Sequence, residues 1–282
     1  MSDSDDPRGY QRDRWESAAE GWAKRSETIT AAGAPVAQWL VEAAALESGD
    51  RVLEVAAGLG DVGLLAAERV GEKGEVWITD GAEGMVEAAA RRAAATGLPQ
   101  LKVAHMEAEW LDAETASFDA VISRWGYMLV VDPQAALREA RRVLKGGGRI
   151  ALAAWDRLEL NPWMAIPRAE FESRGLISAP LPDAPDPFRF AASGVIEDLL
   201  LNVGFSAVRV ESVDLYWPAE SLDDWWEHMR STSSVVGRAT AELSPSEHYE
   251  LRDVLDVGYR DFVQPDGSVL LPGRSWVASA EV

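Results

Sequence analysis

The sequence predicts an α/β protein in which a mostly parallel sheet carries helices on both faces. Short apolar runs rich in β-branched residues alternate with segments of helical periodicity through the first half of the chain. A glycine-rich turn follows the first run, and 282 residues with 47% hydrophobic side chains suffice for one large domain with a sizeable core. Because strands joined through helices at this spacing form crossover units, they are expected to lie parallel.

The centre of this fold is predicted from five strands and the three helices between them. The strands are short apolar runs at residues 51–58, 75–80, 101–106, 117–124 and 148–155. The helices are apolar-periodic segments at residues 62–71, 82–97 and 133–147. Gly71 and Gly97 stand where the first two of these helices are expected to end.

The segments that flank these strands carry weaker patterns. Residues 1–13 are charged and expected to be frayed. Residues 15–46 predict two helices with a break at residues 30–35, "TAAGAP". The proline-rich segment 156–190 is interpreted as a loop with one short helix.

The C-terminal part is predicted to complete the sheet. A helix and two further strands are expected over residues 193–205, 207–217 and 268–280 respectively. Ser221 and Ser244 precede residues typical of helix starts, so two helices are expected between these strands. Pro272 indicates a bulge or an edge in the last strand. The sheet is therefore expected to have seven strands.

The bulk composition excludes some partners. The net charge is −20 and no run of Lys and Arg resembles a phosphate-binding face, which argues against nucleic acid and anionic membrane surfaces. The chain has no cysteine, its first residues are acidic rather than basic, and no apolar run approaches the roughly 20 residues needed to span a bilayer. We therefore expect a cytoplasmic protein with no membrane insertion.

The glycine-rich turn after the first strand predicts a nucleoside-bearing ligand. Residues 58–63, "GLGDVG", match the G-x-G-x-x-G pattern, although such a match also arises from a tight strand-to-helix turn alone. The turn carries two acids, Glu54 and Asp61, and a carboxylate at Glu54 would oppose the pyrophosphate of NAD by about 4 kcal/mol at 4 Å and an effective dielectric constant near 20. The cationic S-adenosylmethionine suits an acidic turn better. Asp80, at the end of the second strand, serves the ribose of either cofactor.

Four segments in order resemble the class I S-adenosylmethionine-dependent methyltransferases. They are "VLEVAAGLGDVG", "VWITDGAEGMVEAA", "MEAEWLDAETASFDAVISRWGYMLVVDP" and "ALREARRVLKGGGRIALAAW". Within that class the sequence is most similar to the ubiquinone/menaquinone-biosynthesis-type group, over about residues 15–155. The segment "RWESAAEGW" resembles the lid helix of that group. The resemblance implies a Rossmann-like fold with a lid at 1–46, a cofactor-binding core at 47–155, and a part at 156–282 whose acceptor-binding cap covers about 156–190 and 219–264.

The resemblance also implies a cofactor site. Its residues are Trp15, Glu54, Ala56, Gly58, Gly60, Asp80, Gly81, Met85, Glu107, Ala108, Ser123 and Arg124. In this pattern Glu54 orients the methionine end, Asp80 binds the ribose, and Glu107 reaches the adenine amino group. The sequence departs from the family pattern where "VAAG" replaces "VGCG", "KGGG" replaces "KPGG", and Glu107 replaces an aspartate.

Catalysis by methyl transfer depends mainly on positioning, and a base is needed only if the acceptor must lose a proton. The sequence assigns no catalytic residue. Tyr127, His228 and His248 are candidates for the base, and each is also interpreted as a packed side chain. No His, Asp or Glu cluster has the spacing of a metal site, so no metal is expected.

Twelve tryptophans are a large number for a chain of this length. Trp15 and Trp22 are seven residues apart, so both lie on one helix face, where they serve either core packing or a lid over the cofactor. Four more lie in the C-terminal part and either line an apolar acceptor pocket or pack in the core: Trp217, Trp225, Trp226 and Trp276.

The sequence therefore predicts methyl transfer from S-adenosyl-L-methionine to a small, partly apolar molecule at oxygen or carbon. Two alternatives stay open at this point. An NAD-dependent oxidoreductase would fit the glycine pattern alone, and a protein that binds S-adenosylmethionine without catalysis would fit every motif. The identity of the acceptor and the oligomeric state are not assigned.

Overall fold

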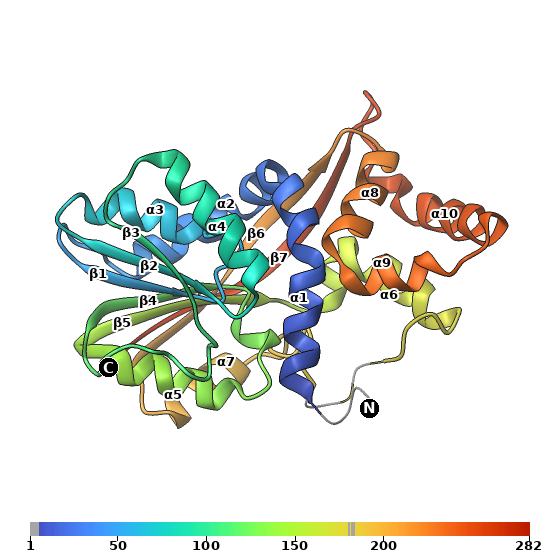
Figure 1. The fold of residues 1–282 in the computed structure, drawn as a ribbon. Coiled ribbons are helices and arrows are strands. Elements are labelled where there is room, and N and C mark those ends of the chain that lie inside the picture. The colour runs from blue at the N-terminus through green and yellow to red at the C-terminus, as the bar shows by residue number, and fades with distance from the viewer. Residues whose placement is uncertain (1–5, 180, 182–183) are drawn as a thin grey trace.

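The computed structural model describes residues 6–179, 181 and 184–282 and contains one seven-stranded sheet (Figure 1). Its strands are β1 (Arg51–Val55), β2 (Glu75–Asp80), β3 (Leu101–His105), β4 (Phe118–Arg124), β5 (Leu144–Trp155), β6 (Ser206–Ala219) and β7 (Val269–Glu281). They are ordered β3-β2-β1-β4-β5-β7-β6, with β1 to β5 parallel and β7 antiparallel to both β5 and β6. The predicted mostly parallel sheet of seven strands is confirmed.

Helices cover both faces of the sheet (Figure 1). One face carries α2 (Ser26–Ala43), α3 (Asp61–Val70) and α4 (Glu83–Thr96), and the other carries α5 (Pro133–Val143) and α7 (Val195–Asn202). The central strand β1 is covered on both faces, which explains why it is an almost uninterrupted apolar run rather than an alternating one.

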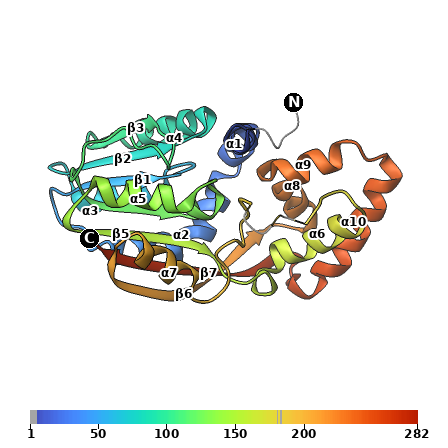
Figure 2. The ribbon, with the colours of Figure 1, turned by 90° about the horizontal axis from the view of Figure 1, so that it is seen from below.

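A group of helices lies beyond the carboxyl ends of the parallel strands (Figures 1 and 2). It consists of α6 (Pro162–Ser173), α8 (Leu222–Thr232), α9 (Ser234–Ala241) and α10 (Pro245–Tyr259). Helices α8 to α10 are inserted between β6 and β7, and α6 packs against α10 and β7. The expected helix starts are confirmed, since Ser221 accepts a hydrogen bond from the Asp224 N–H at 3.1 Å and Ser244 forms a capping box with Glu247.

The N-terminal helices differ from the sequence prediction. Residues 1–13 are expected to be frayed, but helix α1 (Pro7–Lys24) already begins at Pro7. Asp6 caps this helix by accepting a hydrogen bond from the Gly9 N–H at 3.0 Å. Residues 1–5 lie outside the described part of the chain. The break falls at Arg25 rather than at residues 30–35, which are helical within α2.

Gly33 accounts for the helix break that the sequence predicts at residues 30–35, "TAAGAP". A Cβ atom at this position would lie 2.0 Å from Nη1 of Arg124, so the glycine serves a close approach between α2 and the end of β4. A glycine needed for packing and a glycine that ends a helix give the same local signal. The contact partner is 91 residues away in the sequence and could not be read locally.

The remaining corrections concern the ends of elements. Residues 145–147 belong to β5 rather than to the helix before it. The segment 156–190 holds α6, a helix of 12 residues, and α9 was not expected as a separate helix. Short 3₁₀ turns also occur, namely η1 (Tyr127–Leu129), η2 (Leu158–Leu160) and η3 (Arg260–Phe262).

Pro272 lies in an interior strand, but at a place where one side of that strand is open. Strand β7 pairs with β5 only as far as Ser275, opposite Trp155, whereas it pairs with β6 through Pro272 as far as Val269. The segment around Pro272 is therefore a local edge, which confirms the edge interpretation. The pairing with β6 shows its irregularity between Ser206 and Arg209, not at the proline.

Candidate functional site

The predicted cofactor residues converge where the sheet reverses its strand order. Strands β1 and β4 are neighbours whose following helices lie on opposite faces, and ligands of such sheets bind at this switch point. Ala56 and Trp125, the residues directly after the two strands, have left-handed φ angles of 50° and 62°. Such conformations are strained for residues other than glycine and concentrate at functional sites. Sequence reasoning missed Trp125.

Asp80 ties the ends of β1 and β2 together. Its Oδ2 accepts a hydrogen bond from the Gly58 N–H at 2.8 Å, and its Oδ1 accepts one from the Ala82 N–H at 2.9 Å. Burial raises the pKa of Asp80, although these two hydrogen bonds act to lower it. An ionised carboxylate offers about four lone-pair sites, so two remain for a ligand's hydroxyl groups.

The next predicted residues line the ends of β2 and β3. The Glu107 carboxylate lies beside Gly81, and Arg12 of α1 reaches Glu107 Oε1 at 3.5 Å. Met85 and Ala108 are buried, and Met85 packs under Trp15 and Trp22 with a small apolar cluster. The polar Asp80 and Glu107 thus border an apolar surface that α1 covers.

Glu54 does not present a negative charge to this site. Its side chain is 1% exposed, and its Oε2 accepts a hydrogen bond from the Gly63 N–H in the first turn of α3 at 2.8 Å. Burial raises the pKa of Glu54 to about 8, so the carboxyl group is mostly protonated at neutral pH. The expectation that Glu54 repels a pyrophosphate is therefore wrong.

Asp61 is also neutralised within the protein. It pairs with Arg124 and with Arg92, whose Nη1 lies 2.7 Å from Asp61 Oδ1, and it accepts a hydrogen bond from Thr30 Oγ1 at 2.6 Å. Burial would raise the pKa of Asp61, but Arg124 and Arg92 outweigh it and lower the pKa. One carboxylate between two guanidinium groups does not make an acidic turn. The charge of this turn therefore does not favour a cationic cofactor, contrary to the sequence-based expectation.

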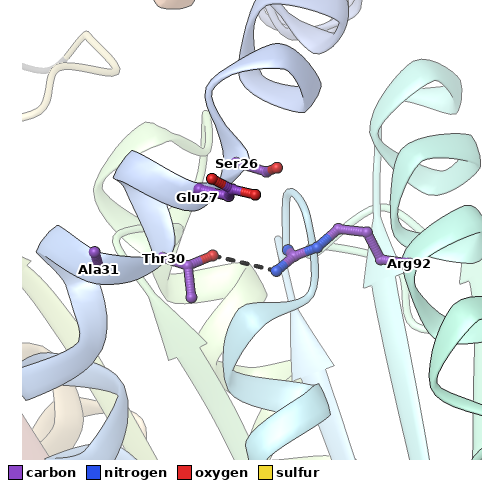
Figure 3. A pocket seen from close by; sticks show the side chains of 5 residues that line it. All are labelled: Ser26, Glu27, Thr30, Ala31 and Arg92. Atoms are coloured by element: carbon purple, nitrogen blue, oxygen red, sulfur yellow. Dashed lines mark hydrogen bonds between the residues drawn. The ribbon is translucent and has the colours of Figure 1, made fainter.

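A shallow hollow of about 490 Å³ opens next to this ion-pair network (Figure 3). Its lining comes from α2 and α4, namely Ser26, Glu27, Thr30, Ala31 and Arg92. Arg92 donates a hydrogen bond to Thr30 Oγ1 at 3.2 Å across it (Figure 3). None of the predicted cofactor residues lines this hollow, so it is not the expected cofactor site.

Helix α1 lies between the sheet and the group of helices beyond it (Figures 1 and 2). Towards the sheet, Glu16 accepts a hydrogen bond from the Gly84 N–H at 3.0 Å, and Trp22 packs near Gly58. Trp15 and Trp22 meet edge to face with ring centroids 5.5 Å apart. Both tryptophans therefore pack above the ends of β1 and β2.

The C-terminal end of α1 is fixed to α8. Trp22 donates a hydrogen bond from Nε1 to the Thr232 carbonyl at 2.9 Å, and Arg25 forms an ion pair with Asp224. A Cβ atom on Gly21 would lie 1.7 Å from the Ser231 carbonyl oxygen, so only glycine fits at this crossing. Helix α1 thus connects the turns after β1 and β2 with the C-terminal helices.

Gly21→Ala is expected to lower the free energy of unfolding by about 1–3 kcal/mol, because the new methyl group collides with backbone that cannot rotate away. Equilibrium denaturation measures this change. Gly146→Ala is the matched control, since no atom outside its chain neighbours lies within 4 Å of the added carbon. Equal stability of the two variants would show that α1 and α8 do not pack as described.

The three candidates for a general base occupy different environments. Tyr127 is 2% exposed, and burial raises the pKa of its hydroxyl group, which opposes its ionisation. His228 is stacked on Trp225, and burial together with Arg25 lowers the pKa of His228 to about 4. His248 Nε2 lies 2.8 Å from the Thr240 carbonyl, which fixes α10 to α9. A catalytic role for any of them stays a prediction.

The tryptophans of the C-terminal part are mostly buried. Trp217, Trp225 and Trp226 are each at most 6% exposed. Trp276 donates a hydrogen bond to the Ala191 carbonyl at 3.0 Å. Trp217 belongs to a larger cluster that the sequence did not indicate, with Trp125, Trp155 and Trp163. Of these, Trp125 and Trp155 are stacked with centroids 4.1 Å apart, at the ends of β4 and β5.

No three His, Asp or Glu side chains in residues 6–179, 181 and 184–282 are grouped as metal ligands. No helix in the same part of the chain has the length and apolar character needed to cross a membrane.

Comparison with known proteins shows what this chain resembles. Residues 52–148 match the family described as a methyltransferase domain. The YcgJ protein of Bacillus subtilis shares the fold with a TM-score of 0.58 at 18% identity, over 87% of this chain and 97% of that one. The matched domain and the sheet order resemble those of class I S-adenosylmethionine-dependent methyltransferases, and the domain indicates a methyltransferase with S-adenosyl-L-methionine as its cofactor.

The similar sequences include ubiquinone/menaquinone biosynthesis C-methyltransferases (UbiE). The protein of Chromobacterium violaceum is 29% identical over 173 residues, covering 58% of this chain and 70% of that relative. The protein of Xanthomonas oryzae is 40% identical over 113 residues, covering 40% of this chain and 45% of that relative. The chain thus spans less than half the length of the second relative. These comparisons give no support to an NAD-dependent oxidoreductase.

Proposed function

We propose that this protein transfers a methyl group to a small, partly apolar acceptor at an oxygen or carbon atom. The observation that carries the proposal is the position of α1, which covers the turns after β1 and β2 on one side and contacts α8 on the other. A cofactor at the strand ends and an acceptor against the C-terminal helices would meet beneath this helix. We accordingly propose a lid at 1–46, a core at 47–155, and a C-terminal part at 156–282 that holds the acceptor-binding cap.

The residues at the strand ends fit S-adenosyl-L-methionine, which supplies an electrophilic methyl group when bound. Asp80 has carboxylate lone pairs free for two ribose hydroxyls, and Glu107 lies beside Gly81, where an adenine amino group would be received. Arg124 Nη1 is buried and has no hydrogen-bond partner among the described residues, so it suits the carboxylate of the methionine end.

Catalysis would come mainly from positioning and from exclusion of water. Helix α1 closes the strand ends with Trp15 and Trp22, which places apolar rings where water would otherwise compete. Ser123, 0% exposed at the end of β4, stands at the boundary between the cofactor residues and the C-terminal helices. A base is required only for an acceptor that must lose a proton, and Tyr127 and His228 are the predicted candidates nearest this boundary in the fold.

Asp80→Asn tests the cofactor site. We expect it to weaken binding of S-adenosyl-L-homocysteine about 100-fold, since hydrogen bonds to a charged group contribute about 1.5–3 kcal/mol each. Titration calorimetry measures the affinity, and the exposed Asp253→Asn on α10 is the control. An unmodified protein that binds neither this compound nor S-adenosyl-L-methionine would refute the proposed function. Binding without turnover over a broad panel of acceptors would favour a non-catalytic binding protein instead.

A further inference from the structure

The buried polar atoms without partners are concentrated in one region. The described part of the chain contains nine buried side-chain nitrogen or oxygen atoms that lack a hydrogen-bond partner. Six of them belong to Ser123 and Arg124 at the end of β4, Tyr127 in η1, Trp217 on β6, and Trp225 and His228 on α8. A buried polar atom without a partner costs about 1–3 kcal/mol, so such a concentration requires an explanation.

These residues form a continuous line from the cofactor side to the C-terminal helices. The Arg124 guanidinium lies 4.9 Å from the centre of the Trp125 ring. The ring centroids of Trp125 and Trp217 are 6.3 Å apart, and those of Trp217 and His228 are 5.5 Å apart. Tyr127 follows Trp125 by two residues in the η1 turn. The residues that carry the unpartnered atoms therefore border one aromatic cluster.

Other indole N–H groups in and around this cluster have hydrogen-bond acceptors within the protein. Trp125 donates to Ser275 Oγ at 3.0 Å and Trp163 donates to Asn161 Oδ1 at 3.0 Å. Trp22 donates to the Thr232 carbonyl at 2.9 Å. Trp217 Nε1 and Trp225 Nε1 are different: at 6% and 2% residue exposure, neither has a partner among the residues described. Of these two rings, Trp217 is the one that also lies next to Trp125, with ring centroids 6.3 Å apart.

The chemistry of Trp217 and His228 indicates what would occupy this place. An indole Nε1–H can only donate, so its missing partner carries a hydrogen-bond acceptor. The neutral His228 ring can donate from Nδ1 as well, and the surrounding indole faces favour a flat, apolar body. An ammonium group would point its own donors at the Trp217 donor, and the carboxylate near His228, Asp224, is already paired with Arg25.

We propose that Trp217 Nε1 and His228 Nδ1 bind an oxygen atom of the methyl acceptor, and that the acceptor is a flat apolar molecule with a hydroxyl or carbonyl oxygen rather than an amine. This assignment rests on the proposed function, because it places the acceptor beside the methyl donor. The two residues position the acceptor, while the cluster around Trp125 and Trp155 provides the apolar wall.

Binding of matched probes tests this assignment. With the protein saturated with S-adenosyl-L-homocysteine, 2-naphthol is expected to bind at least tenfold more tightly than naphthalene or 2-naphthylmethylamine, as measured by calorimetry. Trp217→Phe keeps an aromatic ring but removes the donor, so it should lower the 2-naphthol affinity about tenfold and leave the naphthalene affinity unchanged. Trp163→Phe is the control, because its indole group is already bonded to Asn161.

The outcomes separate this proposal from the one on which it rests. If 2-naphthol binds no more tightly than naphthalene, or if Trp163→Phe lowers its affinity as much as Trp217→Phe, the assignment of Trp217 is wrong. Normal binding of S-adenosyl-L-homocysteine in the same samples would then leave the proposed function intact. Loss of that binding in the unmodified protein would refute the proposed function itself. Tighter binding of the amine than of 2-naphthol would overturn the oxygen-bearing class of acceptor.

Discussion

Asp61→Asn is expected to lower the free energy of unfolding by about 3–5 kcal/mol. The side chains of Asp61 and Arg124 are 3% and 6% exposed, so the substitution leaves a guanidinium group buried without its anion. The second arginine, Arg92, is 26% exposed and can turn towards water, whereas Arg124 is confined against Gly33 and the Trp125 ring. Equilibrium denaturation with urea measures the loss.

A double variant separates the charge from the packing. Asp61→Asn combined with Arg124→Met removes both charges and keeps an unbranched side chain, so it is expected to regain much of the lost stability. Glu20→Gln, in an exposed ion pair with Lys24, should have no measurable effect. If the single variant Asp61→Asn is as stable as Glu20→Gln, the buried ion pair does not hold α2, α3 and β4 together.

The parts of the fold that the sequence predicted well are those whose signals are local. The apolar run of β1 and the alternation of strands with α3 and α4 depend on neighbouring residues, and the expected helix ends at Gly71 and Gly97 are confirmed. Capping residues such as Ser244 likewise act within one turn. These features are encoded over a few residues, so a single sequence reveals them.

The charge of the site could not be predicted, because it depends on distant partners. Glu54 and Asp61 are both acidic in the sequence, yet one is buried with a raised pKa and the other lies between two arginines. Arg92 and Arg124 approach Asp61 from α4 and from the end of β4, 31 and 63 residues further along the chain. A formal charge count at a turn therefore says little about the field that a ligand meets there.

The role of individual tryptophans in the C-terminal part also could not be predicted from the sequence. The sequence named Trp217 among several aromatic residues of equal standing. Only the fold distinguishes it, because Trp217 has no hydrogen-bond partner among the described residues and lies between Trp125 and His228, whereas Trp276 donates to the Ala191 carbonyl. Satisfaction of a hydrogen bond depends on the tertiary structure, and no local pattern in the sequence carries it.

Glu54→Gln is expected to change how the stability of the protein depends on pH. Burial raises the pKa of Glu54 from 4.5 to about 8, so between these values the folded state holds a proton that the unfolded chain has lost. Raising the pH in this window therefore favours unfolding, by about 1.4 kcal/mol per pH unit and up to about 5 kcal/mol in total. The contribution is fully present below pH 4.5 and is lost as the pH rises through 8. Glutamine is uncharged and removes this dependence.

Urea denaturation at pH 5 to 9 measures the effect as a difference between the two proteins. The unmodified protein should lose stability relative to Glu54→Gln up to about pH 8 and then keep a constant difference. Glu75→Gln is the control, because the pKa of Glu75 is shifted in the opposite direction. Burial would raise this pKa, but hydrogen bonds from Lys102, Trp77 and Arg51 lower it to about 2. The contribution of Glu75 is lost only as the pH falls below 4.5, so its variant should run parallel to the unmodified protein above pH 5. A parallel profile for Glu54→Gln as well would mean that Glu54 is ionised in the folded protein, and that the turn after β1 is acidic after all.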